Sequence, residues 1–142
     1  MNEIEAYYDA FSQRFINDIA RGNSRIDRQL EFFACTIPRD AQSVLVLGFG
    51  SGQSVHFIAE RLTRYDARVV GLDLSAENVR FAETLYPHPR VRYRQADLTT
   101  QPLDDTYDVV VLPDVYEHIP VSARPPLHAQ IARILTQTGG FS

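Results

Sequence analysis

Short apolar runs alternate with amphipathic segments along most of this chain. The runs at 44–47, 69–72 and 109–112 contain only Val, Leu and Gly. Such runs are typical of strands that are buried on both faces of a parallel sheet. The segment 91–95 instead alternates between apolar and polar residues, as an edge strand can. The pattern therefore predicts a parallel sheet with the strand at 91–95 at one edge.

Between the runs, apolar residues recur at three- and four-residue steps, which is the helical period. Ser24 and Ser75 stand where helix N-caps are expected. The predicted helices span 3–21, 24–35, 53–65 and 76–86, and a last one starts at Pro125. The alternation predicts an α/β domain, with residues 1–40 as an N-terminal helical cap and 41–142 as the α/β core.

A glycine-rich turn follows the first strand, in the stretch VLVLGFGSG. Gly48, Gly50 and Gly52 occupy every second position. Only glycine adopts positive φ readily and lets a ligand approach the backbone closely. A dinucleotide fingerprint, G-x-G-x-x-G, would need its third glycine at position 53, which is Gln53. The turn is thus of a nucleotide-binding type without the dinucleotide spacing, and a purely structural role for its glycines remains an alternative.

Acidic residues follow the second and third strands. Asp73 ends the second strand and precedes Leu74, and the pair Asp97-Leu98 follows the third. In an open parallel sheet, ligands bind outside the carboxyl ends of the strands. A carboxylate at Asp73 can accept hydrogen bonds from ribose hydroxyls, whereas Ser75 suits the capping role better. NAD-binding domains use the same acid, so Asp73 alone does not distinguish the ligands.

The fourth strand leads into a second group of polar residues, after Pro113. Asp114, Glu117 and His118 follow it and would share one face of a helical turn. A histidine held by a carboxylate can act as a general base. Structural ion pairs make similar clusters, so a role in stabilising the helix start stays open.

Taken in order, these segments resemble the motifs of class I S-adenosylmethionine (SAM)-dependent methyltransferases of the small-molecule type. The resemblance implies a Rossmann-like, open and mostly parallel sheet with helices on both faces and strand order 3-2-1-4-5. It implies SAM as the cofactor, with Asp73 at the ribose and Asp97 at the adenine. The implied cofactor-binding residues are Gly48, Phe49, Gly50, Gly52, Asp73, Leu74, Asp97, Leu98 and Pro113.

The acid-x-x-Glu-His pattern at Asp114, Glu117 and His118 is similar to that of quinone-biosynthesis O-methyltransferases. The resemblance makes these three residues the candidate catalytic group. In those enzymes such residues bind a divalent cation, which is an alternative here, although we predict no metal site.

The predicted reaction is direct in-line transfer of a methyl group to a small molecule, for which positioning is most of the catalysis. An oxygen or carbon acceptor is favoured, because no N-P-P-Y motif follows the fourth strand. The alternatives are a SAM-binding module without catalysis, within a larger protein, and an NAD-binding oxidoreductase domain. Val46 favours the first alternative, since the family usually has an acid at that position.

The chain stops at residues 140–142, where the resemblance places the start of a fifth strand. We therefore expect a core truncated before that strand, with an open edge at 109–112. Proteins avoid such edges, because they template pairing with another chain. A second copy or a missing C-terminal portion would complete the sheet.

Composition limits the partners and the compartment. The formal net charge of −4 argues against nucleic acid, which needs clustered Lys and Arg. Cys35 is the only cysteine, so no internal disulfide forms, and its place in the run EFFAC predicts burial. The acidic first residues and the lack of an 18-residue apolar run predict a cytoplasmic protein without a membrane partner.

Overall fold

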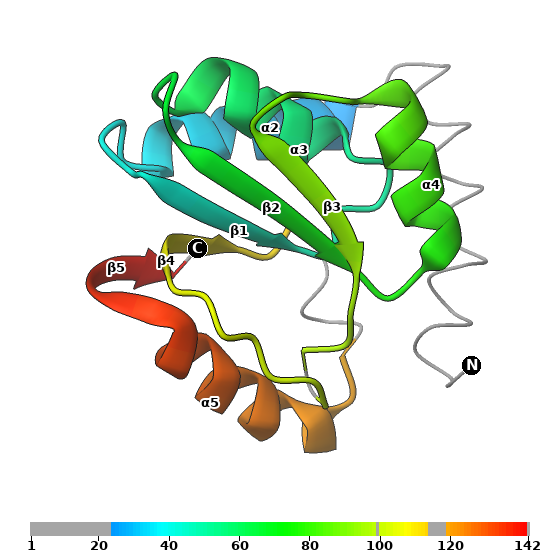
Figure 1. Cartoon of the computed structure of the whole chain (residues 1–142), viewed down its shortest axis with the longest axis vertical. Coiled ribbons are helices and arrows are strands. Elements are labelled where there is room, and N and C mark those ends of the chain that lie inside the picture. The colour runs from blue at the N-terminus through cyan, green and yellow to red at the C-terminus, as the bar shows by residue number, and fades with distance from the viewer. Residues whose placement is uncertain (1–23, 99, 114–118, 142) are drawn as a thin grey trace.

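The computed structural model describes residues 24–98, 100–113 and 119–141. Within these ranges, five parallel strands form one sheet in the order β3-β2-β1-β4-β5 (Figure 1). The predicted strand order is confirmed. The strands are β1 Ser43–Leu47, β2 Arg68–Asp73, β3 Val91–Gln95, β4 Tyr107–Val111 and β5 Leu135–Phe141.

Helices cover both faces of the sheet, as predicted. In Figure 1, α2, α3 and α4 lie on one side of the sheet and α5 lies on the other. The predicted helix at 3–21 lies outside the described residues. No helix of the described ranges is long and apolar enough to span a membrane. The helices are α2 Ser24–Thr36, α3 Gln53–Phe57, the π-helical η1 Ile58–Leu62, α4 Ala76–Leu85, the 3₁₀-helical η3 Val121–Ala123 and α5 Arg124–Ile134.

Burial on both faces explains the unbroken apolar runs. All five residues of β1 are buried, and its side chains alternate between two hydrophobic clusters. Val44 and Val46 belong to the cluster beneath α2, α3 and α4, whereas Leu45 and Leu47 belong to the cluster beneath α5. A polar residue at any of these positions would be buried without a water partner. This two-sided core places the glycine turn at the carboxyl end of β1.

A fifth strand corrects the expectation that the described core is truncated before it. β5 pairs in parallel with β4, from Tyr107 opposite Leu135 to Val110 opposite Phe141, with a register shift between Tyr107 and Val109. Gly140 therefore pairs within the strand instead of forming a turn ahead of it. The irregular register accommodates the extra residues of β5. The edge of β4 is covered, so the expected open edge there was wrong.

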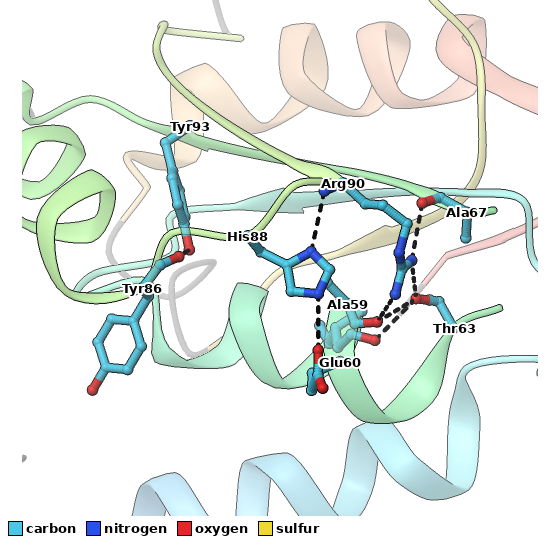
Figure 2. Close-up of polar contacts among 9 residues, drawn as sticks. Ala59, Glu60, Thr63, Ala67, Tyr86, His88, Arg90 and Tyr93 are labelled. Atoms are coloured by element: carbon cyan, nitrogen blue, oxygen red, sulfur yellow. Dashed lines mark hydrogen bonds and ion pairs between the residues drawn. The ribbon is translucent and has the colours of Figure 1, made fainter. Parts of the chain in front are cut away.

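The segment after the glycine turn ends in the π-helical turn η1, which Arg90 closes. Figure 2 shows the Arg90 guanidinium donating to the Ala67 carbonyl at 3.0 Å, to Thr63 Oγ1 at 3.1 Å and to the Ala59 carbonyl. Thr63 Oγ1 donates to the same Ala59 carbonyl at 3.0 Å. Helix ends leave carbonyl groups without intrahelical partners. Arg90, just before β3, supplies the partners for this end.

His88 extends this polar group toward the surface. Its Nδ1 accepts the Arg90 backbone N–H at 3.1 Å, so its Nε2 carries the proton and donates to Glu60 Oε2 at 2.9 Å (Figure 2). This hydrogen bond lowers the pKa of the exposed Glu60 carboxyl below its usual value. The group therefore ties η1 to the turn before β3, at the end of the sheet opposite the glycine turn.

Candidate cofactor-binding site

The glycine turn adopts the left-handed backbone that its sequence predicts. Gly48, Gly50 and Gly52 have φ values of 70°, 66° and 94°. Residues with a Cβ rarely adopt this region. The Gly48 N–H donates to the Leu72 carbonyl at 2.7 Å, and the Gly52 N–H donates to the Phe49 carbonyl at 3.3 Å. The turn is thus fixed against β2 and is closed by its own backbone.

The third glycine also allows α4 to pack closely. A Cβ at Gly52 would lie 2.6 Å from the Cβ of Ala82 and 3.3 Å from Tyr93 Cε1. Real Cβ atoms essentially never come as close as 2.6 Å to another carbon. Gly52 therefore has two reasons to be glycine, and neither of them requires a ligand.

Asp73, at the carboxyl end of β2, links the glycine turn to α4. Its side chain is buried, with 3% exposure. Oδ2 accepts the Gly50 N–H at 3.1 Å, while Oδ1 accepts the Ser75 N–H at 2.9 Å and the Asn78 Nδ2–H at 3.3 Å. A carboxylate oxygen can accept more than one hydrogen bond, so these contacts are compatible with a ribose hydroxyl at the same group. Ser75 is the helix cap, as predicted, since its Oγ accepts the Asn78 N–H at 3.1 Å.

Asp97 lies at the same edge of the sheet as Asp73. The Ala96 N–H donates to the Asp73 carbonyl at 3.0 Å, which places the next residue, Asp97, beside the end of β2. Asp97 is half-buried, and its N–H donates to Gln101 Oε1 at 2.8 Å. Leu74, the residue after Asp73, is half-buried, and its carbonyl accepts a hydrogen bond from the Gln95 side chain. The structure thus brings the predicted turn and both acids to one edge.

The side chains of Phe49, Leu98 and Pro113 are buried. The Phe49 ring lies 5.1 Å from that of Tyr93 in an edge-on arrangement, and it fills the space that a Cβ at Gly71 would need. Leu98 belongs to the cluster on the α5 side. A ligand contact from Phe49 would therefore come from its backbone rather than its ring.

The predicted catalytic residues Asp114, Glu117 and His118 lie outside the described residues. In the ranges that the structure covers, no group of three His, Cys, Asp or Glu side chains could hold a metal ion. The structure describes the residues predicted to bind the cofactor but not the predicted catalytic group, and the roles of both sets stay predictions.

Two residues of the site were missed from the sequence. Asn78 donates to Asp73, and Gly71 leaves room for Phe49. A signal for Asn78 was present, because it stands three residues after the predicted cap Ser75, where a side chain can reach back past the helix start. No local pattern marks Gly71, because its role depends on a ring from another segment.

Comparison with known proteins identifies the family. Residues 44–139 match the family described as a methyltransferase domain. The match covers more than half of the chain, so the chain belongs to this methyltransferase domain family. The chain is 33% identical over 119 residues to phosphoethanolamine N-methyltransferase of Triticum aestivum. The aligned region covers 82% of this chain and 22% of the wheat protein. The chain thus spans less than a quarter of the length of that curated relative.

Solved structures agree with the family. The chain is similar to a TehB-like SAM-dependent methyltransferase of Corynebacterium glutamicum, with a TM-score of 0.78, 25% identity and coverage of 96% of this chain and 71% of that chain. The DhpI structure in complex with S-adenosylhomocysteine (SAH) has a TM-score of 0.80 and 23% identity, covering 98% of this chain and 66% of that chain, which shows a shared fold. The predicted methyltransferase family and its Rossmann-like fold are confirmed.

Proposed function

We propose that this chain binds SAM along the edge formed by the glycine turn, Asp73 and Asp97, and that it transfers the methyl group to a small-molecule acceptor. The observation that carries this proposal is the hydrogen bond from Gly50 to Asp73, which fixes the turn beside a buried carboxylate. In the proposed complex, Asp73 accepts ribose hydroxyls and Asp97 accepts the adenine amino group. Asp97, Leu98 and Leu74 border the adenine, and Pro113 borders the methyl group.

SAM, when bound, supplies a methyl group on a sulfonium that is already a good leaving group. The chain's own task is to hold that group in line with the acceptor atom, since positioning is the main contribution to such a displacement. A base is needed only where the acceptor must lose a proton. The proposed catalytic residues are Asp114, Glu117 and His118, which lie within five positions after Pro113 in the sequence.

The acceptor is proposed as a small molecule that reacts at oxygen or carbon, as the sequence predicts. A nitrogen acceptor is the second candidate, because the wheat relative is a phosphoethanolamine N-methyltransferase by name. The cytoplasmic location and the lack of a nucleic-acid partner stay predictions.

Transfer of a labelled methyl group from SAM tests the function. The chain is incubated with phenolic, carbon-acid and amine acceptors, including phosphoethanolamine, and transferred label is counted. Label on one acceptor class, lost in His118→Ala at unchanged SAH affinity, supports the proposal. Tight SAH binding without transfer to any acceptor would instead support the non-catalytic module, and binding of NAD in place of SAH would contradict both.

A further inference from the structure

Asn78 sits in a helix cap that departs from the usual arrangement. In a capping box, the side chain three residues after the cap accepts the backbone N–H of the cap residue. Here the cap is Ser75, and its N–H goes to Asp73 Oδ1 at 2.9 Å. The residue three positions later is Asn78, and its Nδ2–H donates to the same oxygen at 3.3 Å. Asp73 thus accepts the Ser75 N–H that a capping box would direct to the side chain of Asn78, and Asn78 donates to Asp73 instead.

The two oxygens of Asp73 are consequently held from different sides. Oδ1 is held by α4, through the Ser75 N–H and the Asn78 amide. Oδ2 is held by the glycine turn, through the Gly50 N–H. Contacts at both oxygens fix the rotation of the carboxylate about its own bond. Among these three donors, which all belong to the described residues, two are backbone groups, so the Asn78 amide is the one of the three that a substitution can remove.

The hydrogen bond between Asn78 and Asp73 is buried. Asn78 is 2% exposed and Asp73 is 3% exposed. A buried carboxylate needs hydrogen-bond donors, because water cannot solvate its charge. A carboxylate that has lost one donor is free to turn toward the remaining ones and away from a ligand. The amide of Asn78 therefore opposes that rotation.

We propose that Asn78 is a positioning residue of the cofactor site, whose amide holds the Asp73 carboxylate in the orientation that meets the ribose hydroxyls. This inference rests on the proposed SAM site, and it adds a residue that acts only through Asp73. If Asn78 had a merely structural role in the first turn of α4, it would stabilise that helix without coupling to ligand affinity. The two roles are separated by substitutions of nearly equal shape.

Asn78→Asp provides the sharpest test, because it replaces the amide donor by a second carboxyl group of the same size. Two carboxylates this close repel each other when both are ionised, so the pair keeps one proton up to a higher pH than a lone carboxyl group does, and its second pKa is raised. With that proton, the new carboxyl group donates to Asp73 in place of the amide. When the proton is lost at higher pH, the two groups repel each other and Asp73 turns away.

SAH affinity is measured by calorimetry at pH 5.5 and pH 8.5 for the wild-type chain, Asn78→Asp, Asn78→Ala and the control Glu77→Gln. Glu77 is exposed on the same turn of α4. We expect Asn78→Asp to bind within about threefold of wild type at pH 5.5 and to be about tenfold or more weaker at pH 8.5. Asn78→Ala should be weaker at both pH values by a constant factor, and the control should match wild type. The wild-type chain carries the same Glu77 and Asp97, so it reports any effect of their titration.

Thermal unfolding of the same proteins without ligand gives an independent readout. The raised pKa of the Asn78→Asp pair means that stability is present at low pH and lost as pH rises, so its midpoint should fall relative to wild type between pH 5.5 and pH 8.5. Wild-type SAH affinity in folded Asn78→Ala, or a pH-independent affinity ratio for Asn78→Asp, would overturn the proposal. If Asn78→Asp does not fold, Asn78→Ala alone decides it. If wild type binds no SAH, the proposed function fails, while the melting curves still test the coupling of Asn78 to Asp73.

Discussion

Gly52 and Ala82 touch where the glycine turn meets α4, with room for a hydrogen atom but not for a methyl group between them. A Cβ on Gly52 would lie 2.6 Å from the Ala82 Cβ, on a backbone with φ of 94°. We predict that Gly52→Ala destabilises the chain by about 1–2 kcal/mol for its backbone conformation alone, with the steric clash in addition. Urea unfolding measures the loss.

Gly71→Ala is the matched comparison for that variant. Its new Cβ would lie 2.8 Å from Phe49 Cδ1, but Gly71 does not have a positive φ. The stability lost in Gly71→Ala therefore has a steric cause only. The double variant Gly71→Ala with Phe49→Leu should recover part of that stability. Equal losses for Gly52→Ala and Gly71→Ala would show that the left-handed backbone contributes nothing.

Arg90→Lys should destabilise the chain although it keeps the charge. The planar guanidinium donates to Thr63 Oγ1 and to two carbonyl groups around the end of η1, and an ammonium group cannot reproduce this fork. Hydrogen bonds from charged groups contribute about 1.5–3 kcal/mol each, so we predict a loss of that order. Arg92→Lys, at an exposed position of β3, is the control for urea unfolding and should behave like wild type. A loss of the same size in both variants would contradict the account.

The pair of Glu60 and His88 predicts a small dependence of stability on pH. The hydrogen bond from His88 lowers the pKa of Glu60 in the folded chain below its usual value of 4.5. A carboxyl group with a lowered pKa stabilises the fold above its unfolded pKa, and the effect is lost as pH falls through the folded value. Wild type should thus melt at a higher temperature than Glu60→Gln near neutral pH, and the two should converge as pH falls through the lowered pKa of Glu60. A constant difference down to pH 3 would contradict this.

The strands were predictable because burial on both faces leaves an unbroken apolar run. The structure extends the predicted strands at 44–47 and 69–72 by only one or two residues, and it confirms 91–95. The fifth strand was not predictable in this way. Gly140 indicated a turn, since glycine is poor in strands, but pairing with β4 overrides that local preference.

The exposure of single residues depends on the helix face, which an apolar run does not reveal. Cys35 was expected to be buried in its run, but it is exposed, and so is Phe32 at 57%, whereas Phe33 is buried at 4%. Only Phe33 of these three faces the sheet. The His88 side chain is only 9% exposed, although histidine is polar and the residue lies in a turn. Its partners come from η1 and from Arg90, and no local sequence pattern joins them.

The candidate site was predictable where a residue type is tied to a local feature of the backbone. The three glycines indicated a turn with positive φ, and the place of Asp73 at the end of a strand indicated a residue at the edge of the sheet. The contacts between these residues were not predictable, because they depend on the relative placement of β1, β2 and α4. The hydrogen bond from Gly50 to Asp73 spans 23 positions of the chain and appears only in the folded state.

The central claim is that Asp73 holds the ribose of SAM, and calorimetric titration with SAH tests it most directly. The wild-type chain, Asp73→Asn and the exposed control Asp66→Asn are titrated with SAH and then with NAD, after their folding has been checked by thermal melting. Loss of a charged hydrogen bond to the ligand should weaken SAH binding in Asp73→Asn by about 1.5–3 kcal/mol, or roughly 10- to 150-fold, while Asp66→Asn binds as wild type does. Folded Asp73→Asn with wild-type SAH affinity, or a wild-type chain that binds NAD in preference to SAH, would contradict the account.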